Sequence, residues 1–156
     1  MEKFSSRLKS LLPFLFILAF AAGCDKDDDD EPAKTSYTLS GSANGAQEVP
    51  AVTTNATGTI TGTYNSSSNA LSYTITWTGL SGAPTLMHFH GPALAGANAS
   101  PALDITGFPA TVVGTHSGTA TLTDTQEADL LAGKWYYNIH TPDHGGGEIR
   151  GQVAAQ

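Results

Sequence analysis

Within residues 69–78, apolar and polar residues alternate strictly from residue 71 onward. Leu71, Tyr73, Ile75 and Trp77 occupy every second position, and serine or threonine fills each position between them. A period of two places the large side chains on one face of a β-strand and the hydroxyl groups on the other. This stretch predicts a half-buried antiparallel strand whose apolar face needs a second layer of sheet to cover it.

The same alternation recurs between turn residues along most of the chain. It predicts strands or short extended pieces at residues 37–43, 47–52, 56–64, 102–105 and 114–123. Pro50 places the second of these at an edge or a bend, because proline lacks a backbone donor. Seven or eight short strands separated by turns indicate an all-β fold, an antiparallel β-sandwich of Greek-key type.

Two further strands are predicted near the C-terminus, joined by a turn that contains Pro142 and the glycines at 145–147. In the first strand the large apolar residues are expected to face the core, which places Asn138 and His140 on the opposite face. In the second strand Glu148 and Arg150 oppose the apolar phase in the same way. Because the two strands are expected to pair as a hairpin, His140 should lie near Glu148.

Residues 86–91 follow the same rule with histidines. Met87 and Phe89 take the apolar phase, and His88 and His90 take the other. Residues two apart on a strand lie on one face, so the two imidazoles should be side by side. Whether this strand also lies beside the strand of His140 does not follow from the pattern.

One segment carries a helical signal. Asp124 can cap a helix, Glu127 is placed as its capping-box partner, and Gly133 ends it. The helix would be about two turns long. We expect it to form a crossover that packs Leu130 and Leu131 on the core.

Composition and charge narrow the class of protein. Charged residues make up 13% of the 156 residues, and 17 are glycine, a mix that favours an extracellular all-β domain over a helical enzyme. From residue 37 onward seven acidic residues stand against only Lys134 and Arg150. A domain with so few basic residues cannot follow a phosphate backbone, which argues against nucleic-acid binding.

Residues 1–23 have the organisation of a bacterial lipoprotein signal peptide. Basic residues precede an apolar run at 11–22, which is too short to span a bilayer. The run ends in Ala21-Ala22-Gly23-Cys24, which resembles a lipobox with alanine in place of the usual leucine. Cys24 is the one cysteine of the chain, so we expect it to be lipidated and to anchor the protein to a membrane. The alternative is an ordinary signal peptide.

Residues 24–36 are predicted to form an acidic, disordered tether ahead of a single domain at 37–156. Like charges and proline cannot bury apolar area. A lysine followed by acidic residues after the lipidated cysteine also resembles the surface-export signal of lipoproteins in some Gram-negative bacteria. We therefore expect an outer-membrane lipoprotein of the cell envelope that is exposed at the surface. A plain spacer and an attachment that faces the periplasm are the alternatives.

Several separate motifs stand in one order over residues 37–153. They are Leu39-Ser-Gly with Glu48-Val-Pro, His88-Phe-His-Gly-Pro92, residues 130–133, Tyr137-Asn-Ile-His-Thr141 and Gly147-Glu-Ile-Arg-Gly-Gln152. This order resembles that of CHRD domains, the modules first described in chordin. Ala51 departs from the second proline that the family often has after Pro50. The resemblance implies the sandwich fold and an extracellular address. The growth-factor antagonism of the animal relatives is not carried over.

The histidines support two interpretations. As neutral imidazoles, His88, His90 and His140 could bind copper or zinc, with Glu148 close by and His144 as a further ligand. Alternatively, the polar residues of the three strands form a structural or ligand-binding hydrogen-bond network, because buried polar groups must be paired. The members of that network would be His88, His90, Asn138, His140, Glu148 and Arg150. His116, among small polar residues, is expected at the surface.

Little in the sequence favours catalysis. There is no Gly-x-Ser-x-Gly elbow and no pair of carboxylates in an apolar setting. Trp77 and Trp135 lie on the apolar phase, which favours a place in the core over a platform for stacking carbohydrate. Three classes are kept, in this order: an anchored binding or adhesion module for an unknown protein or small ligand, a protein that binds copper or zinc, and a metal-dependent enzyme.

Overall fold

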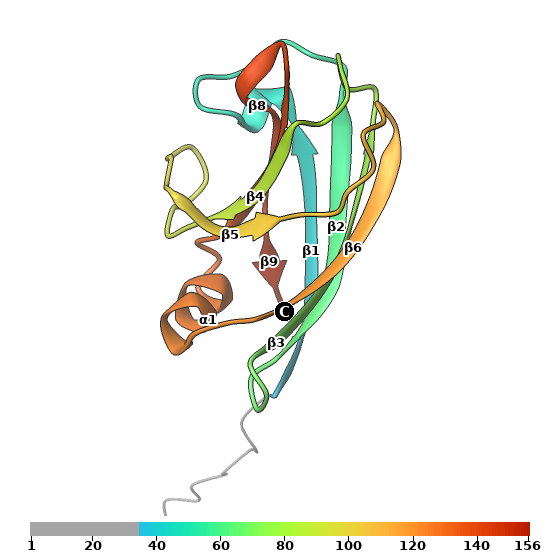
Figure 1. Cartoon of the computed structure of the whole chain (residues 1–156). Helices are drawn as coiled ribbons and strands as arrows, with labels where there is room; N and C mark the ends of the chain where they lie inside the picture. The colour runs from blue at the N-terminus through green and yellow to red at the C-terminus, as the bar shows by residue number, and fades with distance from the viewer. Residues whose placement is uncertain (1–34) are drawn as a thin grey trace, which may run out of the picture. The chain divides into compact units, whose positions relative to one another are not determined.

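The structure is a computed structural model that describes residues 35–156 (Figure 1). The expected signal peptide, Cys24 and all but the last two residues of the expected tether lie outside this part of the chain. The described residues form strands β1 (Ser36–Asn44), β2 (Thr57–Asn65), β3 (Ala70–Thr78), β4 (Leu86–His90), β5 (Pro101–Ile105), β6 (Gly114–Thr121), β7 (Tyr136–Thr141), β8 (His144–Gln152) and β9 (Ala154–Ala155), with the 3-10 helix η1 (Gly45–Gln47) and the helix α1 (Asp124–Leu131).

All strand pairs are antiparallel, and the strands form one continuous sheet. Their order is β5-β4-β7-β8-β1-β2-β3-β6, with β9 paired to β1. The sheet curls so far that its two halves face each other as the layers of a sandwich, and it nearly closes into a barrel (Figure 1). The predicted all-β antiparallel fold with one short helix is confirmed. A ninth strand arises because the end of the chain adds to β1.

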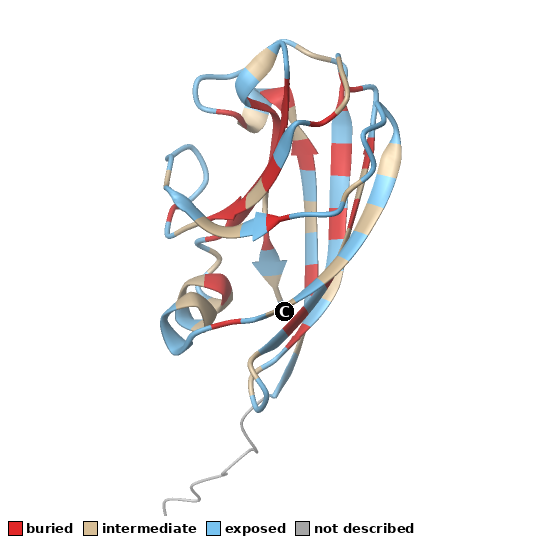
Figure 2. Ribbon diagram, in the orientation of Figure 1, coloured by how far each residue is buried: buried red, intermediate tan, exposed pale blue. Residues whose placement is uncertain are grey.

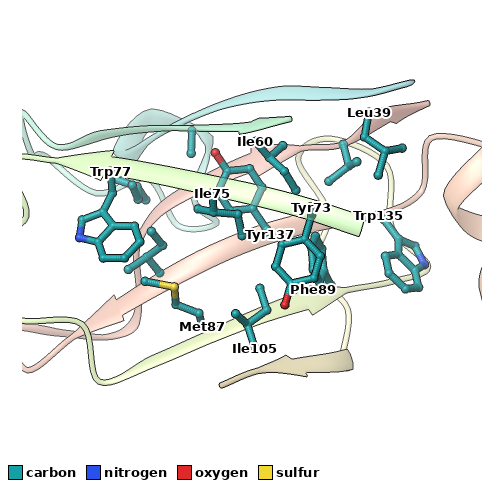
Figure 3. Packing of buried hydrophobic residues seen from close by; sticks show 14 of the residues in the cluster. Leu39, Ile60, Tyr73, Ile75, Trp77, Met87, Phe89, Ile105, Trp135 and Tyr137 are labelled. Atoms are coloured by element: carbon teal, nitrogen blue, oxygen red, sulfur yellow. The ribbon is translucent and has the colours of Figure 1, made fainter. Parts of the chain in front are cut away.

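The core lies between the two halves of this sheet (Figure 3). Tyr73, Ile75 and Trp77 reach into it from β3, as the alternation predicts, and Trp135 packs at its far end. Trp77 is 2% exposed and Trp135 1% exposed, so both tryptophans belong to the core. The indole N–H of Trp77 donates to the carbonyl oxygen of Thr111 over 2.8 Å, which satisfies the one polar atom of that side chain.

The outward positions of β1, β2, β3 and β6 carry mostly serine and threonine. They lie opposite one another across the strands, as Thr59 does with Thr76 and Thr74 with Ser117. The hydroxyl oxygens of these two pairs are 2.7 and 2.8 Å apart. This half of the sheet therefore presents a hydroxyl-rich surface whose pairs stabilise neighbouring strands.

Three predicted elements differ from the structure in detail. The piece at 47–52 is not a strand: Asn44 accepts a hydrogen bond from the backbone of Gln47 and starts η1 instead. Helix α1 is capped by Thr123 with Gln126 as its capping-box partner, one residue before the predicted pair. Strand β8 begins at His144, so the three glycines lie within it.

Candidate functional site

Strands β4, β7 and β8 lie side by side and bring the polar positions together. His88 pairs with Asn138 across β4 and β7, and Asn138 pairs with Arg150 across β7 and β8. The adjacency of β4 and β7, which the sequence pattern left open, sets the histidines of both strands on one face.

The loop at 91–100 covers this face. The carbonyl oxygen of Ala99 lies 2.9 Å from His90 Nδ1, and Arg150 donates to the carbonyl oxygen of Ala97. As a result His90 is only 7% exposed and Asn138 only 3%. His88 lies at the edge of the cluster, with 14% of its side chain exposed, and faces the largely exposed Asp104 at 3.8 Å. The outward face of this half of the sheet is therefore a second, polar interior.

The three imidazoles converge. One ring nitrogen from each of His88, His90 and His140 lies within 4.8 Å of the other two. The closest pair is His88 Nδ1 and His140 Nε2, 3.1 Å apart. Such a group of nitrogen atoms is a suitable ligand set for a transition-metal ion.

Backbone carbonyls fix the tautomer of two of these rings. His90 Nδ1 lies 2.9 Å from the carbonyl oxygen of Ala99, and His140 Nδ1 lies 3.0 Å from that of Gly145. Because a carbonyl oxygen only accepts, each Nδ1 carries a proton and donates it. In the neutral ring Nε2 is then a bare acceptor that points into the cluster. Histidines that bind metals are commonly oriented in this way.

The surroundings oppose protonation of two of the imidazoles. Burial lowers the pKa of His88 below its ordinary 6.5, the charge of His90 lowers it further, and Asp104 opposes the change. Burial also lowers the pKa of His140, against a hydrogen bond to Gly145 that raises it. Both rings are therefore neutral at neutral pH, the state in which imidazole binds metals.

Arg150 closes the other side of the cluster. It is 1% exposed, and it donates to Ala97 O over 2.7 Å and to Asn98 Oδ1 over 3.1 Å. Its guanidinium lies 3.4 Å from the centre of the Tyr136 ring. Tyr136 in turn stacks on His90, with the ring centres 4.7 Å apart. This stack fixes the plane of the His90 ring.

Glu48 is a buried acid beside the cluster that the sequence interpretation did not include. Burial raises its pKa to about 7, against the charge of Arg150 and a hydrogen bond from Asn138, both of which lower it. A side chain at position 147 would collide with Glu48 Oε1 and Asn138 Nδ2. Gly147, with φ at +121°, therefore allows Glu48 and the amide of Asn138 to meet.

Glu148 does not join the histidines. Its carboxylate accepts hydrogen bonds from Thr54, Thr141 and both the backbone and the hydroxyl of Ser81. Burial raises its pKa, but these hydrogen bonds outweigh burial and leave the pKa below its usual value. The register shift between Ile139 and Thr141 changes the phase of β8 ahead of Ile149, so alternation places Glu148 wrongly. Through these hydrogen bonds Glu148 connects the loop that contains Thr54 with the loop that contains Ser81.

The remaining histidines lie apart from the cluster. His144 pairs with Thr141 at the hairpin end, and the group of converging nitrogens does not include it. His116 is not a plain surface residue: it is half-buried, with its ring 6.2 Å from that of Tyr73.

The main residues of the site that sequence reasoning missed are Glu48, Tyr136 and the carbonyls of Ala99 and Gly145. Only the phase of Tyr136 was a signal, since it alternates with Tyr137.

No helix among the described residues is both long and apolar enough to cross a bilayer.

Comparisons with known proteins identify the domain. Neither curated proteins nor solved structures give a match to this chain. The CHRD domain family, in contrast, matches residues 39–153, which includes every residue of the cluster. The chain therefore belongs to the CHRD domain family.

Proposed function

We propose that this protein binds a divalent transition-metal ion, zinc or copper, through His88, His90 and His140. The observation that carries this proposal is the convergence of three ring nitrogens within 4.8 Å in a buried setting. Two of the rings are fixed by hydrogen bonds from their other nitrogen to backbone carbonyls. Imidazole nitrogens suit zinc and copper, whose sites in proteins commonly use two or three histidines.

The clefts beside the cluster favour an ion over an organic ligand. One cleft of about 140 Å³ lies between Glu48, Arg150 and Gln152, and another of about 280 Å³ lies between Glu48 and the glycines of β8. Sites for organic ligands usually have about 300 to 1,000 Å³. The histidine cluster is therefore better matched to a ligand that needs no cleft. The broader role as a binding module is compatible with the family.

Calorimetry on the full-length protein, with zinc and copper(II) in separate titrations, tests the proposal. We expect one equivalent to bind, and we expect His90→Ala and His140→Ala each to lose most of the affinity. His144→Ala is the matched control, because His144 lies outside the group of converging nitrogens. Affinity should fall below about pH 6, since protonated imidazole cannot coordinate a metal.

Two results would contradict metal binding at this cluster. The first is the absence of binding by the parent protein at micromolar metal. The second is equal binding by the parent and by His90→Ala, which would place the metal elsewhere. Either outcome would leave the alternative, in which the imidazoles form a structural hydrogen-bond network.

We also propose that Cys24 is lipidated and that the domain is held at the cell envelope, exposed at the outer surface. This proposal rests on the apolar run at 11–22 and the Ala-Ala-Gly-Cys motif that ends it. Cys24→Ser should move the protein from the membrane fraction to the soluble fraction or leave it unprocessed. Retention of the Ser variant in the membrane fraction would count against the anchor.

A further inference from the structure

Asn138 stands among the histidines in a way that hydrogen bonding alone does not explain. Its Oδ1 lies 3.0 Å from His90 Nε2 and 3.0 Å from His140 Nε2. Both of these nitrogens are bare acceptors in the neutral rings, because each Nδ1 donates its proton to a backbone carbonyl. An amide oxygen is also an acceptor. Oδ1 therefore faces two ring nitrogens that give it no proton, and His88 Nδ1, 3.1 Å from His140 Nε2, is directed at that ring and not at the amide oxygen.

The orientation of Asn138 is imposed from its other side. The amide nitrogen of Asn138 and the carboxylate of Glu48 face each other beside Gly147. Gly147 leaves the space in which these two groups meet, since a methyl group there would collide with both. With the amide nitrogen on the side of Glu48, the amide oxygen faces the two imidazoles. Glu48 is thus the positioning residue for Asn138.

We propose, on the basis of the metal site proposed above, that Asn138 Oδ1 is the fourth ligand of the ion. A cation between the four atoms turns the facing lone pairs from a repulsive contact into a coordination shell. Ligand bonds of about 2.0 Å in a tetrahedron place neighbouring donor atoms about 3.3 Å apart. Three of the six edges, at 3.0, 3.0 and 3.1 Å among Asn138, His90, His140 and His88, are close to that length. The three imidazole nitrogens lie within 4.8 Å of one another, so a small movement of the rings completes the shell.

The fourth ligand determines what kind of site this is. Catalytic zinc sites keep one position for water or substrate, whereas closed sites fill all four positions with protein atoms. Three imidazole nitrogens and one amide oxygen make a closed set. The set contains no sulfur, the donor that selects copper(I). The site holds a divalent ion for binding or storage and leaves no position for a reaction on the metal.

Cobalt(II) and copper(II), added separately to the full-length protein, test the fourth ligand. Four-coordinate cobalt(II) absorbs visible light far more strongly than six-coordinate cobalt(II), and isotopically labelled water broadens the copper(II) resonance only when water is bound. We expect the parent to give the strong cobalt(II) band and no broadening. Asn138→Ala should still take up one equivalent, with affinity lowered about tenfold, and should show broadening by bound water.

Controls separate this proposal from the metal site itself. Asn98→Ala removes an exposed amide that contacts Arg150 and not the histidines, so its spectra should match the parent. If Asn138→Ala does not fold, Asn138→Asp keeps an oxygen at the same place and should shift both spectra and tighten binding. Unchanged spectra in either Asn138 variant, or water already bound in the parent, would overturn the fourth ligand. Failure of the parent to bind any metal would overturn the proposed function instead.

Discussion

The outward face of the sheet differs between its two halves. On β1, β2, β3 and β6 the outward positions carry mostly serine and threonine, and many positions along these strands are exposed (Figure 2). Thr61 is one of the exposed residues. On β4, β7 and β8 the same kind of position carries His90, Asn138 and Arg150, which are buried. Strand periodicity is the same in both halves. The difference comes from the loop at 91–100, which covers only the second half.

Alternation therefore shows which way a residue points and not whether water reaches it. In the open half an outward residue needs no protein partner, because water satisfies it. In the covered half every polar atom needs a partner within the protein, and an unpaired one costs free energy. Substitutions should therefore change the free energy of unfolding little at outward positions of the open half. At outward positions of the covered half they should lower it.

The inward face of β3 gives the largest expected effect and sets the scale for this comparison. Trp77→Ala should lower the free energy of unfolding by about 3 to 5 kcal/mol, because it removes a large buried side chain. Thr76→Ala, one residue away on the opposite face, should lower it by only about 0.2 to 1 kcal/mol, the contribution of its hydroxyl pair with Thr59. Urea denaturation of both variants measures the difference. Comparable losses would show that the open face contributes to stability as much as the core does.

Arg150→Ala tests the covered half directly. It should cost about 2 to 4 kcal/mol, because two hydrogen bonds from a charged group and the contact with Tyr136 are lost together. Thr61→Ala, at an outward position of β2, is the matched control and should be nearly neutral. Denaturation midpoints provide the readout. If Arg150→Ala were as mild as the control, the loop at 91–100 would not make this face an interior.

Glu148→Gln should cost about 1 to 3 kcal/mol at neutral pH, since the carboxylate accepts several hydrogen bonds. The pKa of Glu148 is lowered in the folded protein, so its stabilising contribution is complete above the ordinary value of 4.5. That contribution is lost as the pH falls through the folded pKa. The difference between parent and variant, measured by denaturation from pH 7 to pH 3, should therefore shrink towards acid. A difference independent of pH would mean that charge plays no part.

Glu48→Gln should have the opposite sign and the smallest effect. Burial raises the pKa of Glu48 to about 7, so its contribution to stability is complete below 4.5 and is lost as the pH rises through 7. In the metal-free protein the variant should be more stable than the parent at pH 8 by about 1 kcal/mol, less than the full pKa shift implies because the glutamine amide is itself buried there. At pH 4 the two should be equal. Destabilisation of the variant at pH 8 would contradict this account of Glu48.

The sequence predicted the fold far better than the site. Periodicity located the core residues of β3, and the phase of β4 and β7 placed His88, His90 and His140 on outward positions. The sequence could not predict that the loop at 91–100 covers this face. The contacts of Ala97 and Ala99 use backbone carbonyls, which every residue type has, so no side-chain pattern indicates them. It misplaced Glu148, because the register shift in the β7–β8 hairpin leaves no clear mark in the pattern. It did not place Glu48 in the site, because the burial of Glu48 depends on distant elements.

Crystallography of the zinc-loaded protein, with anomalous scattering measured on both sides of the zinc absorption edge, is the most direct test of the central claim. We predict one strong anomalous peak about 2.0 to 2.2 Å from His88 Nδ1, His90 Nε2, His140 Nε2 and Asn138 Oδ1. A peak at another place, or none at this cluster in crystals soaked with saturating zinc, would show that these histidines do not form a metal site.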